Sequence, residues 1–243
     1  MRKSFISKSF LFGTLLLITQ SIFAQNNNNR FVNKTEQQWV QYYSENILNE
    51  KWSIPFDLGF RWRNNFKQSS QYLVRGAISY KINDRLSVAA GFGHLGYYSG
   101  NNVNATEARP HQEISYKHNL GTIGIGHRVR IERRFVTRNA NTANSIRYRY
   151  SLMFNLFSFP ISTGNPDLQF VFRVGNEIFL NTGNDNLETA FSQNRFMISP
   201  TIQFSDQFKV NLTWNSQYAA TDDDEVFDQT DVLWIQVRHK LNW

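Results

Sequence analysis

Apolar and polar residues alternate with a period of two along most of this chain. From residue 52 to residue 63 the even positions carry Trp, Ile, Phe, Leu, Phe and Trp, and the odd positions carry Ser, Pro, Asp, Gly, Arg and Arg. Successive side chains of a strand point to opposite faces, so this pattern predicts strands with one apolar and one polar face. Similar runs predict eleven strands at 38–47, 52–63, 71–82, 86–98, 110–118, 122–135, 145–157, 168–181, 190–204, 208–218 and 232–243.

The length of these runs favours strands that cross a membrane. Trp52 and Trp62 share a face, and ten residues at about 3.3 Å each separate them by roughly 33 Å. A tilt of about 40° reduces this to roughly 25 Å, the height of the apolar band of outer-membrane barrels. A soluble sandwich or lipocalin-like barrel would also alternate, but it would not need runs this long.

The chain begins like an exported protein. Arg2, Lys3 and Lys8 precede an apolar stretch that is too short to span a bilayer, and small residues follow it up to Ala24. The predicted organisation is a signal peptide at 1–24, a polar N-terminal segment at 25–37 and a barrel at 38–243. Cysteine is absent from the sequence, which excludes disulfides, thiolate metal sites and a lipidated cysteine.

The strand number is the weak point of this prediction. Short turns alternate with longer polar loops at 64–70, 99–109, 137–144, 182–189 and 219–231, as expected for periplasmic turns and external loops. The connection at 158–167 breaks the alternation, because it should be short. Single-chain bacterial barrels have even strand numbers, so an antiparallel barrel of about twelve strands is predicted, with a weak first strand near 30–34. The alternatives are that 25–37 threads the lumen, or that ten strands close without 38–47.

Several segments resemble a known family. They are Glu36-Gln37-Gln38-Trp39-Val40-Gln41-Tyr42, Arg61-Trp62-Arg63, Arg109-Pro110-His111-Gln112 and the basic run from Arg130 to Arg134. With the signal, they are similar to domain-of-unknown-function family 2490, which is common in Bacteroidota. The resemblance covers nearly the whole chain after the signal and implies an outer-membrane barrel. It implies no established activity and supplies no functional residues.

If the apolar positions face lipid, the alternate positions face a lumen rich in arginine. Guanidinium groups bind carboxylates and phosphates in forked geometry, and basic rings line anion-preferring pores. The sequence therefore predicts a narrow anion-preferring pore or carrier; the alternative is a closed structural or adhesive barrel whose lumen the same side chains fill. The predicted lumen-facing residues are Arg61, Arg63, Arg75, Arg128, Arg130, Arg134, Arg147, Arg149, Arg173 and Arg238, with the acids Asp57, Glu113, Glu132 and Glu177.

The predicted partners follow from an outer-membrane location. Trp52, Trp62, Trp214 and Trp243 are predicted to lie at the membrane interfaces, in contact with outer-membrane lipid and lipopolysaccharide. The apolar ending at Trp243 resembles the C-terminal signal that barrel-assembly machinery recognises. The formal charge of +7 falls to +4 without the three basic residues of the signal, and the remaining basic residues are spread over many segments, so nucleic acid is not an expected partner.

Catalysis and metal binding are weaker interpretations. His94 and His111 flank a predicted external loop that also holds Ser99, which suggests a lipid-modifying rim site, but the expectation is that the protein is not an enzyme and holds no cofactor. An acidic loop could offer oxygen ligands to Ca²⁺ or Mg²⁺, although a solvated loop is the favoured interpretation and no metal site is predicted. Its acids are Asp222, Asp223, Asp224 and Glu225, followed by Asp228 and Asp231.

Overall fold

The structure is a computed structural model of the chain, and it describes residues 31–182, 191–221, 223 and 225–242. The predicted signal peptide at 1–24 and Trp243 lie outside the described residues. Residues from Val32 onward belong to one compact unit. In the part of the chain that is described, no helix is long and apolar enough to cross a bilayer.

The described residues form eleven strands, so the predicted all-β class is confirmed. Most of the strands are longer than the sequence pattern indicated. They are β1 (Phe31–Ile47), β2 (Trp52–Arg63), β3 (Gln68–Lys81), β4 (Leu86–Ser99), β5 (Asn102–Leu120), β6 (Ile123–Arg138), β7 (Asn141–Pro160), β8 (Gln169–Thr182), β9 (Phe191–Gln203), β10 (Phe208–Ala220) and β11 (Val226–Asn242).

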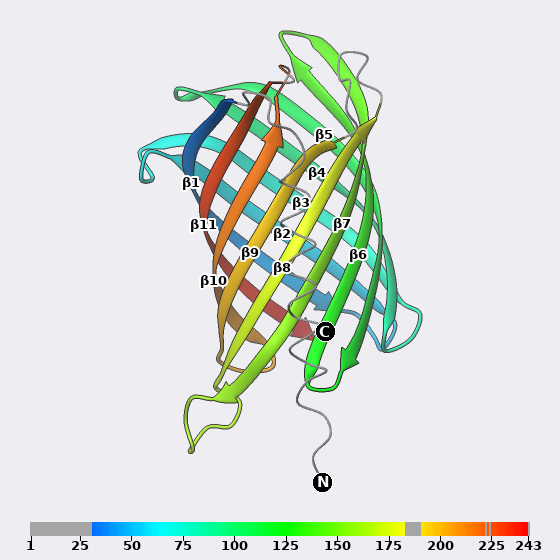
Figure 1. Ribbon diagram of the computed structural model, residues 1–243. Coiled ribbons are helices and arrows are strands. Elements are labelled where there is room, and N and C mark those ends of the chain that lie inside the picture. The colour runs from blue at the N-terminus through cyan, green and yellow to red at the C-terminus, as the bar shows by residue number, and fades with distance from the viewer. Residues whose placement is uncertain (1–30, 183–190, 222, 224, 243) are drawn as a thin grey trace. The chain divides into compact units, whose positions relative to one another are not determined.

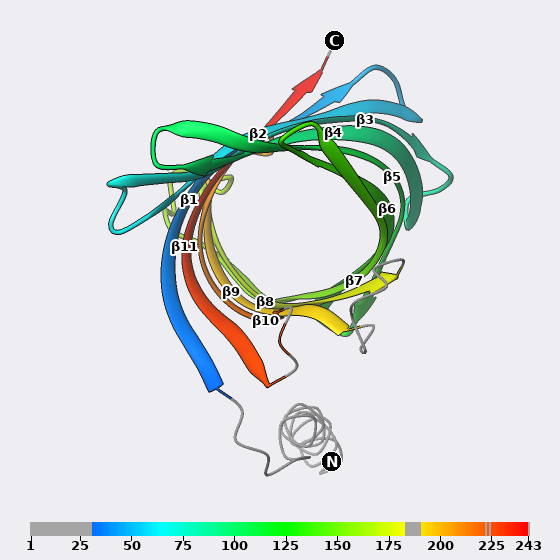
Figure 2. The same cartoon turned by 90° about the horizontal axis from the view of Figure 1, so that it is seen from above.

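The strands close into a barrel in which each one lies beside its sequence neighbours (Figures 1 and 2). All ladders between consecutive strands are antiparallel. The lower end of the barrel in Figure 1 carries the connections at 48–51, 82–85, 121–122, 161–168 and 204–207. The other end is called the upper end below.

The barrel closes where β1 meets β11, and these two strands run in the same direction. Asn33 contacts Asp228, and Thr35 contacts Thr230, each pair being 195 residues apart. The same spacing joins Trp39 to Trp234 and Tyr43 to Arg238. Contacts that advance together along both strands define a parallel pair.

The prediction of twelve strands is therefore wrong, as is the alternative of ten. An up-and-down chain of eleven strands ends in the direction in which it began, so the last strand can close onto the first only in parallel. Parallel pairing is only slightly less stable per residue than antiparallel pairing, so one such seam is tolerable. The part of the polar segment from residue 31 to residue 37 adds no strand, because it extends β1 instead.

Several predicted long loops are extensions of the strands. The segment 99–109 lies mostly in β5 and leaves a two-residue turn at 100–101, where Gly100 has a positive φ. A second two-residue turn lies at 139–140, where Asn139 and Ala140 both have positive φ, as type I′ hairpins require. Main-chain hydrogen bonds between strands do not require apolar side chains. The polar segments therefore continue the strands, although their polarity predicts loops. The eight-residue connection at 161–168 remains a true loop.

The seam can be tested with a disulfide, because the chain has no cysteine of its own. The Oγ1 atoms of Thr35 and Thr230 are 2.9 Å apart, so the double variant Thr35→Cys/Thr230→Cys is expected to oxidise to an intramolecular disulfide. Electrophoresis of the denatured protein with and without reductant measures this. In the control Thr35→Cys/Asp228→Cys, the second cysteine lies two residues away from the position opposite residue 35, so this pair should remain reduced. Equal cross-linking of the two pairs would contradict the parallel register.

Candidate functional site

The lumen gathers the charged side chains of the wall. Alternate residues along each strand point inward, and the ten predicted arginines and four predicted acids all occupy inward positions or make contacts there. They line the interior cavities or take part in ion pairs across them: Arg61, Arg63, Arg75, Arg128, Arg130, Arg134, Arg147, Arg149, Arg173, Arg238, Asp57, Glu113, Glu132 and Glu177.

Glu132 on β6 is the most heavily paired carboxylate. It is fully buried, and its Oε1 accepts a hydrogen bond of 2.7 Å from Arg149, while its Oε2 accepts hydrogen bonds from Arg147. Arg130 and Arg109 approach within 3.6 and 4.0 Å. A carboxylate held this way stays charged in the interior because several guanidinium donors replace its water shell.

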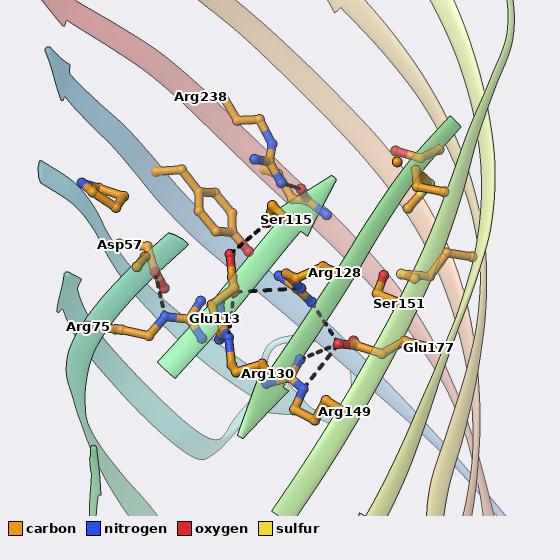
Figure 3. A pocket seen from close by; sticks show the side chains of 18 of the residues that line it. Asp57, Arg75, Glu113, Ser115, Arg128, Arg130, Arg149, Ser151, Glu177 and Arg238 are labelled. Carbon is orange, nitrogen blue, oxygen red and sulfur yellow. Dashed lines mark hydrogen bonds and ion pairs between the residues drawn. The ribbon is translucent and has the colours of Figure 1, made fainter. Parts of the chain in front are cut away.

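Glu177 on β8 forms a second centre beside the first. Its Oε1 accepts hydrogen bonds from Arg128 at 2.6 Å and from Arg149 at 2.8 Å, and Arg195 lies 3.8 Å from its Oε2. Arg149 therefore bridges Glu177 and Glu132, which makes the two centres one network across β6, β7 and β8. Figure 3 shows Arg128 and Arg149 converging on Glu177 from neighbouring strands.

Two further carboxylates line the lower cavity and are also paired with arginines. Glu113 accepts a hydrogen bond of 2.7 Å from Arg130 and one of 3.2 Å from Ser115. Asp57 accepts one of 2.8 Å from Arg75 (Figure 3). Each predicted lumen acid therefore has at least one arginine partner.

Sequence reasoning missed Glu107, Arg109 and Arg195. Glu107 is fully buried and binds Arg109 at 2.7 Å and Arg134 at 2.8 Å, and it also accepts a hydrogen bond from Tyr97. The polarity of the segment places the first two in a predicted external loop, although their odd numbering matches that of the inward residues that follow them. Arg195 lies in a strand whose alternation is weak.

Two large cavities lie in the described part of the lumen, one toward each end. The upper one measures about 520 Å³ and the lower one about 470 Å³. Because five residues line both cavities, these side chains form a layer between them, which is called the partition below. They are Tyr43, Arg75, Arg149, Arg195 and Trp234.

Aromatic side chains line one side of the upper cavity and carry arginines on their faces. The Arg61 guanidinium lies 3.8 Å from the ring centre of the buried Trp39, and Arg195 lies 4.6 Å from that of Phe179. Trp39 also meets Trp234 edge-on at 5.2 Å. Stacking of this kind stabilises guanidinium groups without neutralising them, so Arg61 keeps its charge in the lumen.

The predicted interfacial tryptophans lie on the outer side of the wall where they are described. Trp52 packs against Tyr80 near the lower end, and Trp62 packs against Phe66 near the upper end. Trp214 is exposed midway along β10, between strand ends at Phe208 and Ala220.

The histidine rim site is not assembled, and the acidic loop is only partly described. His94 is exposed on the outer side of β4, whereas His111 is buried on the inner side of β5 and lines the lower cavity. The two imidazoles therefore lie on opposite faces of the wall. Of the acidic loop, Asp222 and Asp224 lie outside the described residues, and the described residues contain no group of three or more potential metal ligands.

Comparison with known proteins gives a family but no activity. A family described as "Protein of unknown function (DUF2490)" matches residues 36–228, and the chain therefore belongs to it. No curated protein and no solved structure matches the chain.

The central network predicts a large stability effect. Glu132→Gln leaves the guanidinium groups of Arg147 and Arg149 buried without that carboxylate, and removing one partner of a buried ion pair costs about 3–5 kcal/mol. Urea unfolding followed by tryptophan fluorescence measures the loss. The control Asp84→Asn breaks the exposed pair between Lys81 and Asp84 and should leave the midpoint unchanged. Equal midpoints for the two variants would contradict the structural role of the network.

Proposed function

Because the chain belongs to a family whose description assigns no activity, we propose a function from the lumen alone. The protein is a barrel of the bacterial outer membrane that passes small anions through a narrow, arginine-lined lumen. The observation that carries this proposal is the excess of inward guanidinium groups over carboxylates on both sides of the partition.

The outer surface supports the membrane location. Large apolar side chains stand exposed around the wall, including Ile78 at 59% and Ile114 at 53%. Soluble monomers rarely expose continuous apolar surface of this kind, whereas a closed barrel in lipid requires it because its main-chain groups are satisfied within the wall. Exposed aromatics at both ends match interfacial girdles. Lipid and lipopolysaccharide are then the expected surroundings, and the lower end faces the periplasm.

The charge balance of the lumen supports anion preference. Eight arginines lie within 4.0 Å of the inward-facing acids Asp57, Glu107, Glu113, Glu132 and Glu177. Further arginines make no ion pair with any described residue: Arg61 and Arg63 line the upper cavity, and Arg173 and Arg238 line the lower one. Excess positive charge in a narrow, poorly solvated lumen concentrates anions and repels cations.

A closed structural barrel is the second candidate, and the partition favours it. Arg149 is buried and tied to two carboxylates, and Tyr43 and Trp234 belong to the same layer. If the side chains of this layer do not move apart, the two cavities remain separate. The protein would then act through the external end of the barrel. Conductance distinguishes the two candidates.

The membrane location predicts a defined fractionation. Expressed with its N-terminal segment in a Gram-negative host, the protein is expected in the outer-membrane fraction and should resist carbonate extraction. Trp243→Ser should lower the assembled yield if assembly machinery recognises the apolar ending. Wild-type protein recovered in the soluble periplasmic fraction would contradict the proposal.

The pore predicts small anion-selective currents. Refolded protein in planar bilayers should pass chloride in preference to potassium, and Arg63→Gln should reduce this preference because Arg63 faces the upper cavity without an acid partner. The control Arg133→Gln removes the same charge from the exposed outer side of β6 and should leave the selectivity unchanged. Cation-selective currents would contradict anion preference, and the absence of current would favour the closed barrel.

A further inference from the structure

Three cationic side chains lie at the lower end of the lumen, and none of them forms an ion pair with a described acid. Arg173 lies on β8, Lys209 on β10 and Arg238 on β11; together they are called the lower cation cluster below. Lys209 and Arg238 are directly opposite each other in the β10–β11 ladder. Arg173 reaches across to β9, where its Nη2 donates a hydrogen bond of 2.9 Å to Thr201. Thr201 in turn pairs with Asn211 of β10, two residues from Lys209.

The arrangement is unfavourable without a counter-charge. Like charges placed directly opposite each other destabilise a sheet, and among the described residues none of the three cations makes an ion pair. Glu45 lies exposed near the end of β1 and makes no ion pair with any of the three. Elsewhere in the lumen the acids form ion pairs with arginines outside this cluster. These acids are Asp57, Glu107, Glu113, Glu132 and Glu177.

Both guanidinium groups also hold a donor that the described residues leave unused. The Nε atoms of Arg173 and Arg238 are buried and have no hydrogen-bond partner. Their Nη2 atoms bond to neutral oxygens, those of Thr201 and Gln236. An unsatisfied buried donor costs more than an ordinary hydrogen bond gains, and native proteins rarely retain one without a reason.

The residues that carry these donors line open space of useful size. Arg173, Arg238 and Gln236 line the lower cavity of about 470 Å³. Arg173 also lines an adjoining recess of about 290 Å³ together with Thr201 and Lys209. Figure 3 shows Arg238 on the far side of the lower cavity from the paired arginines Arg130 and Arg149. A space of this volume is typical of small-molecule sites.

We propose that the lower cation cluster binds a small oxyanion that carries at least two negative charges, such as phosphate or a phosphate monoester. Two guanidinium groups supply forked donors, the Lys209 ammonium supplies a further charge, and Thr201 and Gln236 supply polar contacts at the edge. Guanidinium geometry matches phosphate oxygens in pairs. The inference rests on the proposed function. It names the class of anion that the pore or carrier would select and the site at which this anion would bind.

Calorimetry of the refolded full chain with inorganic phosphate tests the site. Saturable binding is expected, and Arg173→Gln and Arg238→Gln should each weaken it by about tenfold or more, since each removes charge-assisted hydrogen bonds. Arg238→Lys keeps the charge but loses the forked Nε donor, so its affinity should fall between wild type and Arg238→Gln. The control Arg133→Gln removes a charge outside the lumen and should bind as wild type does. The mobility of unheated samples on electrophoresis verifies that each variant is folded.

Three results would overturn the site: no saturable phosphate binding, equal affinity in wild type and both Gln variants, or equal weakening by Arg133→Gln. Conductance separates this failure from failure of the pore. Chloride current without phosphate binding would retain the pore and reject the site, whereas phosphate binding without current would retain the site and reject the pore. If both hold, phosphate added on the periplasmic side should reduce the chloride current, and Arg173→Gln should relieve that block.

Discussion

A closed wall that is apolar on its outer side leaves a single interior for the charged side chains of its strands, and the rest of this structure follows from that constraint. The interior holds more guanidinium groups than carboxylates, so five inward-facing acids each bind one or more arginines. Glu132 and Glu177 share Arg149 and tie three strands together. The arginines left without an acid lie on both sides of this network, where stacking on Trp39 or a bond to Thr201 holds them without cancelling their charge.

The same constraint explains how an odd number of strands can close. The wall needs its main-chain groups satisfied all around, but it does not need every neighbour to be antiparallel. The contacts from Asn33–Asp228 to Tyr43–Arg238 keep one spacing along β1 and β11. They also bring Trp39 and Trp234 together inside the lumen, so the seam contributes two aromatic side chains to the lining of the upper cavity.

Much of this could be predicted from the sequence, because period-two alternation is a local property. It identified the eleven strands and assigned Arg130, Arg149 and Glu177 to the same face. It did not show how eleven strands could close, since direction at the seam depends on the whole chain, and the even strand number usual for such barrels led to the prediction of twelve. It also misplaced Glu107, because the alternation of side-chain polarity fades where the main-chain ladder continues. Which guanidinium groups lack a carboxylate depends on register between strands, and no single strand contains that information.

The central claim is that the lumen holds uncompensated positive charge on both sides of the partition. Crystals of the protein grown in sodium bromide test it directly, because bromide is an anion that anomalous diffraction locates. The account predicts anomalous peaks in both cavities, beside Arg61 in the upper one and beside Arg173 and Arg238 in the lower one. Bromide found on the outer surface and in neither cavity would contradict it.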